Sequence, residues 1–291
     1  GYDLLALMHG SEGMLGIVVE VTVKLLPVPV EVAVLLAAFT DVGQAADAVG
    51  QIIDRGLIPA GLEMMDKLAV QAAEAFVHAD YPLDAAAILI CELDGSSVEI
   101  EQQQALLTQV LQTAGAVQVR CAKDAEERRK LWLGRKAAFP AVGRLAPDYY
   151  CMDGTIPRRE LARVLRSIAD FSQTHGLAVA NVFHAGDGNL HPLILYDANQ
   201  PGQLERAEAF GADILRLCIA CGGTITGEHG VGVEKINEMC VQFTTEELNV
   251  FHGVKAAFDE QGGLNPGKAV PTLQRCAEFG AMHVHRGQEK F

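Results

Sequence analysis

The sequence predicts an α+β fold: a ferredoxin-like domain with a largely antiparallel sheet and helices on one face, preceded by the last strands of another domain. From Glu31 onward, runs with the two-residue period of strands alternate with runs with the 3.6-residue period of helices. Their β-α-β and β-α-β order is typical of ferredoxin-like halves, and such a sheet packs helices on one face. With 49% apolar and 21% charged residues, the composition is that of a globular protein.

The first 27 residues carry the strands of the preceding domain. Residues 17–25 (IVVEVTVKL) alternate apolar and polar side chains, which predicts a strand with one buried face. Residues 4–8 are a second, shorter strand candidate. Pro27 and Pro29 then close the segment, and we place a domain boundary there.

The remaining elements follow in turn along the chain. Strands are predicted at 32–39, 60–65, 85–93, 116–121, 149–156, 177–184 and 190–196. Helices are predicted at 41–55, 66–77, 96–114, 124–139, 158–175, 203–220 and 244–258, the first started by an Asp cap and the fifth by Pro157.

Charge and cysteine content limit the partners and the compartment. The formal net charge of −14 disfavours nucleic acid and anionic lipid as partners. No apolar run reaches about 18 residues without a charge, so we expect no direct membrane insertion. The seven cysteines are scattered without a compact framework, and we interpret them as reduced thiols of a cytoplasmic protein. Cys218 and Cys221 have C-x-x-C spacing, but we interpret them as small helix residues.

Two loops carry residues suited to chemistry. Residues 181–192 read NVFHAGDGNLHP, in which a turn-rich AGDGN separates His184 from His191, so a tight reversal would bring both imidazoles to one point. Residues 222–232 read GGTITGEHGVG, a glycine-rich loop that contains Glu228 and His229 in succession.

These side chains suit a catalytic metal site, although a plainer interpretation stays open. Two imidazoles and the Glu228 carboxylate are sufficient ligands for a divalent ion with open positions, and His229 would face the space above the ion as a base. Alternatively, AGDGN is only a hairpin turn, the two histidines are satisfied polar side chains and Glu228 caps a helix. A P-loop is excluded, because no Lys-Ser/Thr pair follows either loop.

Four segments together resemble one family. The segments are residues 10–27, 181–192, 222–235 and 264–268, and they occur in the order found in FAD-linked oxidases of the vanillyl-alcohol oxidase type, with their C-terminal cap domain. Residues 131–159 and 275–287 most resemble the FAD-linked subunits of bacterial glycolate oxidases. The resemblance implies that 1–27 end the FAD-binding domain, that 28–262 form the cap, and that 263–291 return to the flavin side.

The resemblance also implies roles for individual residues. Its metal ligands correspond to His184, His191 and Glu228, its active-site base to His229, and its substrate-carboxylate arginine to Arg135. The last is, from the helical pattern alone, a solvated charge. The metal would be zinc, manganese or iron. The implied FAD neighbours are Gly10, Ser11, Glu12, Gly13, Gly16, Ile17, Asn265 and Lys268, the last two in a segment that by pattern is a plain turn.

The chain departs from relatives that oxidise larger hydroxy-diacids. Where those carry Thr, Lys and Asn, this chain has Phe139, the Tyr150–Cys151 region and Leu193. With fewer polar groups to hold a second carboxylate, we expect a small 2-hydroxy acid such as glycolate or D-lactate.

The resemblance further implies a complex with a second flavoprotein-like subunit and an iron–sulfur subunit, through which the protein would be peripheral to the inner membrane face. Two other functions stay open. One is a metal-dependent hydrolase that uses the His, His, Glu set without flavin. The other is a non-catalytic ferredoxin-like assembly module.

Overall fold

The computed structural model describes residues 1–272 and 276, which fall into two compact units. We call Pro27–Gly223 the sheet unit. Gly1–Leu26 and Thr224–Phe291 form the second, which we call the terminal unit because it contains both ends of the chain.

The sheet unit is built on one seven-stranded sheet with the order β4-β1-β3-β2-β6-β7-β5, in which each neighbouring pair is antiparallel. Its strands are β1 (Glu31–Phe39), β2 (Gly61–Asp66), β3 (Ala87–Gly95), β4 (Gln118–Cys121), β5 (Asp148–Cys151), β6 (Val179–Phe183) and β7 (Pro192–Tyr196). The predicted combination of helices with an antiparallel sheet is therefore confirmed.

Two halves share this sheet: a complete ferredoxin-like half, and a second half with the same element order but three strands. The first contains β1, α2 (Val42–Asp54), β2, β3, α4 (Ser97–Thr113) and β4, with the strand order 4-1-3-2. The second contains β5, α7 (Leu161–His175), β6, β7 and α8 (Gln203–Ala220), and η1 (Arg158–Glu160) precedes α7. The halves join where β2 pairs with β6, through Met64 opposite Phe183.

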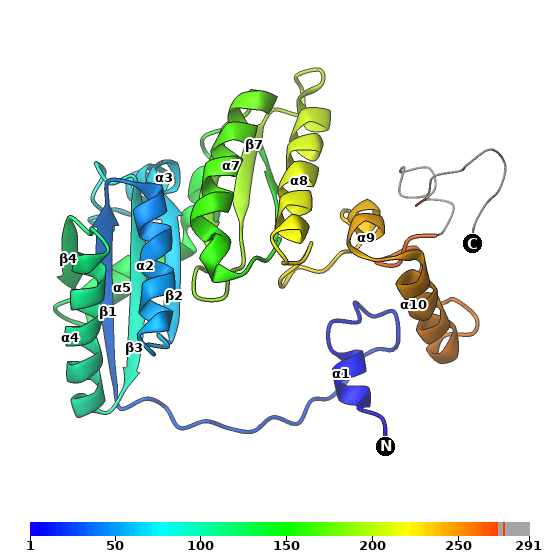
Figure 1. The fold of residues 1–291 in the computed structure, drawn as a ribbon, viewed down its shortest axis with the longest axis horizontal. Helices are drawn as coiled ribbons and strands as arrows, with labels where there is room; N and C mark the ends of the chain where they lie inside the picture. Colours follow the sequence, from blue (N-terminus) through cyan, green and yellow to red (C-terminus); the bar gives the residue numbers. More distant parts are fainter. Residues whose placement is uncertain (273–275, 277–291) are drawn as a thin grey trace. The chain divides into compact units, whose positions relative to one another are not determined.

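Helices cover both faces of the sheet, which corrects the expectation of helices on one face. Figure 1 shows α2, α4, α7 and α8 in front of the strands. On the other face, α3 (Lys67–Val77), α5 (Ala125–Lys136) and α6 (Ala138–Val142) pack in one apolar cluster with alternate residues of β1, β3, β6 and β7. The cause is visible in β1, whose residues 33–39 are all buried, because a strand covered on both sides reads as a continuous apolar run.

Asp66 ties the two halves together at the β2–β6 junction. Its Oδ1 accepts a hydrogen bond from the Ala69 amide and caps α3, while its Oδ2 accepts from the backbone and side-chain nitrogens of Asn181, at 2.9 and 2.8 Å. Complete burial raises the pKa of Asp66 to about 6 despite these hydrogen bonds.

The terminal unit corrects two predicted strands. Residues 4–8 form a short helix, α1 (Leu4–Met8), because the Asp3 side chain caps it by accepting from the Ala6 amide at 3.0 Å. Residues 17–25 belong to no strand, and their apolar side chains are exposed, Val19 by 91%. Alternation marks the face that a strand would bury, but pairing requires a neighbouring strand, and none among the described residues pairs with this segment.

Among its described residues, the terminal unit also contains the helices α9 and α10 and a disulfide. The helix α9 (Ile236–Gln242) was not predicted, whereas α10 (Thr245–Phe258) was. Cys240 in α9 forms a disulfide with Cys276, with Cα atoms 5.4 Å apart, which corrects the expectation that all seven cysteines are thiols. Spacing could not predict this pair, because 36 residues separate them. Residues 273–275 and 277–291, with most of the predicted 263–291 segment and of the 275–287 motif, lie outside the described residues.

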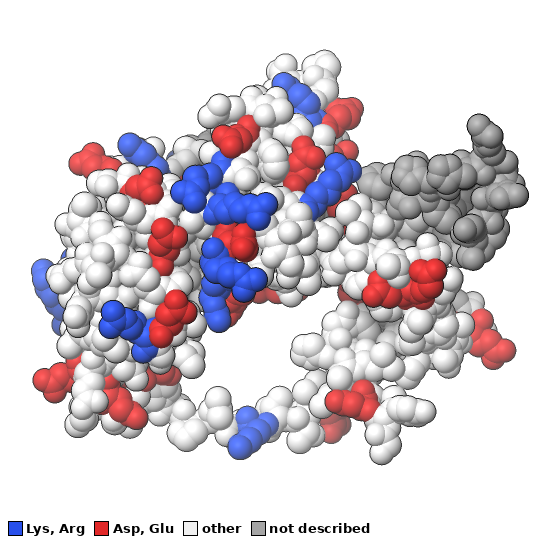
Figure 2. All heavy atoms as spheres, in the orientation of Figure 1, with Lys and Arg blue, Asp and Glu red and all other residues white. Residues whose placement is uncertain are grey.

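Both signs of charge lie on the visible face of the sheet unit. In Figure 2, basic side chains gather over α7 and α8, with acidic side chains among them. Among the described residues, no helix combines the length and the apolar character needed to cross a membrane.

Candidate functional site

The β6–β7 hairpin brings two predicted site residues together. His184 follows β6, His191 precedes β7, and their ring centroids lie 5.1 Å apart at an interplanar angle of 86°. His184 and Asn189 exchange backbone hydrogen bonds of 3.1 and 3.3 Å, which close the turn that the AGDGN sequence predicts. The predicted reversal is thus present, and it makes the two imidazoles neighbours.

Each imidazole has its Nδ1 atom next to an oxygen that accepts hydrogen bonds. The Nδ1 of His184 donates to Glu63 Oε1 at 2.9 Å, and the Nδ1 of His191 lies 3.3 Å from the Met152 carbonyl oxygen. Because neither oxygen can donate, each Nδ1 carries the proton in the neutral ring, and the lone pair is on Nε2. Histidines that ligate a metal through Nε2 commonly have this tautomer, with an oxygen that accepts a hydrogen bond from Nδ1.

Glu63, in β2, also binds the predicted substrate arginine. Arg135 Nε donates to Glu63 Oε2 at 3.0 Å, and Arg135 Nη2 lies 2.7 Å from the same oxygen. Arg135 is only 7% exposed, so the interpretation of this residue as a solvated helix charge is wrong. Burial raises the pKa of Glu63. The hydrogen bond to His184 and the charge of Arg135 lower it by more than burial raises it, so the net shift of the pKa is downward.

The Nη2 atom of Arg135 is buried and makes no hydrogen bond of good geometry to any described residue. A buried guanidinium with an unsatisfied donor is costly unless a ligand or water supplies an acceptor. A carboxylate is the acceptor that best matches this planar fork.

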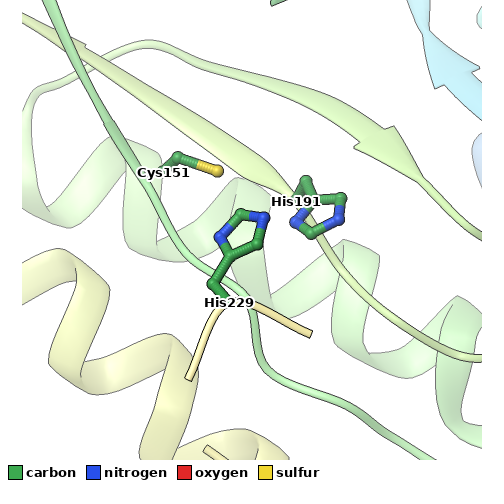
Figure 3. A group of neighbouring side chains, drawn as sticks. All are labelled: Cys151, His191 and His229. Carbon is green, nitrogen blue, oxygen red and sulfur yellow. The ribbon is translucent and has the colours of Figure 1, made fainter. Parts of the chain in front are cut away.

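The surroundings of His191 are mixed in polarity. Its ring packs edge-on against Phe139, with centroids 5.9 Å apart. A ring nitrogen of His191 lies within 4.8 Å of the Cys151 sulfur and also within 4.8 Å of a carboxylate oxygen of Asp153, which is fully buried. Figure 3 shows the Cys151 thiol, at the end of β5, and the His191 ring, which immediately precedes β7, the strand that pairs with β5. Cys151 is paired with the buried Leu193 in the register of β5 and β7.

Gly188 is required by the hairpin, and we expect Gly188→Ala to lower the free energy of unfolding by about 3 kcal/mol. Its φ is +74°, and an added Cβ would lie 2.2 Å from the Ile156 carbonyl oxygen, so the change combines left-handed strain with a backbone clash. Gly202→Ala is the matched control, because its φ is +77° but nothing lies within 4 Å of the added Cβ. Its loss should be about 1 kcal/mol. Equal losses in denaturant titrations of the two variants would contradict the assigned clash.

In the terminal unit, Glu228 and His229 lie on a loop that is hydrogen-bonded to Glu12. His229 Nε2 is 3.8 Å from Glu228 Oε1, and both side chains are about half exposed. The amides of Val231 and Gly232 donate to the Glu12 carboxylate at 2.7 and 2.8 Å. Glu228 does not cap a helix, because α9 begins only at Ile236 with Lys235 as its N-cap.

The residues predicted as flavin neighbours form a second group in the terminal unit. Gly10, Ser11 and Glu12 line a largely apolar cavity of about 530 Å³. Asn265 Nδ2 donates to the Glu12 carbonyl oxygen at 2.5 Å, so the LNPGK segment does lie beside the 10–16 segment. Gly10 and Gly13 both have a φ of +72°, a conformation that favours glycine. The remaining predicted neighbours are Gly16, the 78% exposed Ile17 and the half-buried Lys268.

Sequence reasoning did not single out the carboxylates of Glu63 and Asp153. It named Glu12 but did not predict the contacts of its carboxylate. Glu63 lies in the run GLEMMD, where a charged residue stands among apolar residues of a strand. A charge at such a position is buried only with a partner, and this was a usable signal. The signal could not identify the partners.

Comparisons with known proteins show the family to which the chain belongs. Residues 28–269 match the family described as "FAD linked oxidases, C-terminal domain". The chain aligns over its whole length with "Glycolate oxidase subunit GlcD" from Escherichia coli (strain K12). The two are 62% identical, and the alignment covers 58% of that protein. The protein of the same name from Bacillus subtilis (strain 168) is 38% identical to this chain. That alignment covers 92% of this chain and 57% of the relative. The chain therefore spans somewhat more than half the length of these relatives.

Solved structures share the fold at much lower identity. A p-cresol methylhydroxylase with bound substrate superposes with a TM-score of 0.64 at 13% identity, over 85% of this chain and 54% of the other. At this identity the likeness supports the fold only.

Proposed function

Because the chain belongs to the FAD-linked oxidases, of which it contains the C-terminal domain, we propose that it is the substrate-side part of an FAD-dependent 2-hydroxy-acid dehydrogenase. The substrate would be glycolate or D-lactate, and the product the 2-oxo acid. The observation that carries this proposal is the cluster in which one carboxylate, Glu63, binds both a buried arginine and a histidine of a histidine pair.

The residues present fit a divalent ion. His184 and His191 are neutral nitrogen donors whose Nδ1 protons are directed to oxygens, and each would bind a metal through Nε2. We propose Glu228 as the third ligand. Nitrogen and carboxylate donors suit zinc, manganese and iron alike.

The residues of the 10–16 segment fit a flavin. Positive-φ glycines let the backbone approach a cofactor closely, and no described heavy atom lies within 4 Å of a Cβ added at Gly10. We propose Gly10, Ser11, Glu12, Gly13, Gly16, Ile17, Asn265 and Lys268 as the FAD neighbours that this chain supplies.

Each side chain has one task in the proposed reaction. Arg135 binds the substrate carboxylate through its buried guanidinium, whose Nη2 atom makes no hydrogen bond of good geometry to a described residue, and His229 removes the proton of the substrate hydroxyl. When bound, the ion would polarise the substrate oxygens and FAD would accept the hydride.

The surroundings of His191 favour a short substrate. Phe139 packs on the His191 ring, and Cys151 pairs with the buried Leu193, so these positions offer no cation or amide to a second carboxylate. A carboxylate placed there would lose its hydration without compensation.

Electrons would leave through partner subunits. We propose a second flavoprotein-like subunit and an iron–sulfur subunit, with the complex in the cytoplasm or peripheral to the inner membrane face. The relatives named as glycolate oxidase subunits support a multi-subunit assembly.

A substrate panel on the FAD-loaded enzyme tests the proposal. Under anaerobic conditions, glycolate or D-lactate should bleach the flavin, and kcat/KM for 2-hydroxyglutarate should be at least about a hundredfold lower. Equal rates for the diacid would contradict the proposed size limit. No bleaching by any 2-hydroxy acid would refute the dehydrogenase and favour the flavin-free hydrolase or the assembly module.

A further inference from the structure

We infer that Glu63 is a positioning residue that couples the proposed metal site to the proposed substrate-carboxylate site. This inference rests on the proposed function, because it assigns Glu63 through His184 and Arg135. Glu63 was not among the residues that sequence or resemblance singled out. Its two carboxylate oxygens are divided between those two partners.

The division of the carboxylate is specific. Oε1 accepts from His184 Nδ1 at 2.9 Å, and Oε2 accepts from Arg135 Nε at 3.0 Å. One rigid planar group therefore fixes both the orientation of the imidazole and the position of the guanidinium. A shift of His184 or of Arg135 is transmitted to the other, because both are hydrogen-bonded to the Glu63 carboxylate.

Only a carboxylate satisfies both partners. His184 Nδ1 and Arg135 Nε are both donors, so the group between them must accept on both sides. A glutamine at this position would present its NH₂ group to one of them. If it faced His184, the ring proton would have to move to Nε2, the atom that would bind metal. If it faced Arg135, two donors would repel and displace the guanidinium.

The strand fixes Glu63 in place. It lies in β2, and the His184–Asn189 turn is fastened beside it, because the Gly186 amide donates to the Leu62 carbonyl at 2.9 Å. The side chain of Glu63 is 12% exposed and those of Arg135 and His184 are 8% and 32% exposed. Buried hydrogen-bonded ion pairs of this kind hold their geometry, which is what a positioning role requires.

The test compares Glu63→Gln with Glu92→Gln in the FAD-loaded enzyme. Glu92 is a matched control, since it is a half-buried strand carboxylate whose Oε2 accepts from Trp132 Nε1 at 2.5 Å and contacts neither site. Two quantities are measured: the dissociation constant for Mn²⁺ by competition with a chelator, and KM and kcat for glycolate and D-lactate. For Glu63→Gln we expect tenfold to hundredfold weaker Mn²⁺ binding together with at least a tenfold higher KM, and for Glu92→Gln less than a twofold change in either.

The outcomes separate this inference from the proposed function. If the unaltered enzyme binds Mn²⁺ and oxidises the substrate but Glu63→Gln changes neither constant more than twofold, the coupling by Glu63 is refuted while the function stands. If both variants weaken binding equally, Glu63 is merely structural and the inference is also refuted. Should Glu63→Gln not fold, Glu63→Asp decides, because the shorter carboxylate reaches one partner: at least a fivefold change in one constant supports the role, and no change in either refutes it.

Discussion

Replacing His229 with asparagine is expected to lower the rate of flavin reduction by about a thousandfold while FAD remains bound. The proposed role of His229 is to remove the hydroxyl proton, and a positioned general base contributes about a hundredfold to ten-thousandfold to a rate. Asparagine is polar and of similar size, but it cannot accept this proton. The described contacts of the 10–13 segment with the loop are made by the amides of Val231 and Gly232, so the flavin side should be unaffected.

The measurement is anaerobic stopped-flow bleaching of the flavin by substrate. His78→Asn is the matched control: His78 ends α3 with a φ of +52°, a conformation that asparagine tolerates well, and it belongs to neither cluster. The control should keep its full rate. Retention of more than a tenth of the original rate in His229→Asn would remove this residue from the proton-transfer step.

Periodicity predicted the sheet unit well because local sequence determines which face an element buries. The strand and helix predictions from 32 to 220 each correspond to an element of the structure, and Asp41 and Ser96 cap α2 and α4 through their side chains. The same reasoning failed for residues 17–25, since alternation does not show that a partner strand exists. It also underestimated the helix layers, although the unbroken apolar runs of β1 and β3 already indicated burial on both faces.

Prediction of the site depended on sequence separation. His184 and His191 are close because one short turn joins their strands, and the residues of that turn predict it from the sequence. Glu63 is 121 residues from His184, and only the β2–β6 pairing makes them neighbours. The burial of Arg135 likewise follows from packing in the complete sheet unit, which the pattern of helix α5 does not contain.

Replacing His184 with alanine is expected to remove the proposed metal ion and, with it, at least about 99% of the flavin-reduction rate. Changes behind a ligand cost tenfold to hundredfold in metal affinity, so loss of one of three proposed ligands should cost more. Folding should be less affected than metal binding, because the His184 side chain is 32% exposed and Glu63 keeps its hydrogen bond to Arg135. Metal content after dialysis, measured by atomic spectroscopy, should fall from about one ion per chain to less than a tenth of that.

The chain supplies a chemically matched control for this loss. His175 Nε2 lies 2.9 Å from Asp213 Oδ2, so it is also a histidine paired with a carboxylate in the sheet unit, with its ring stacked on Phe210. His175→Ala breaks the same kind of contact at a histidine outside the proposed ligand set and should lower stability without loss of metal. If both variants kept their ion, the bound metal would not be held by His184, and the three-ligand site would have to be abandoned. If both variants lost the ion, the loss would reflect weakened folding, because His175 is not one of the proposed ligands.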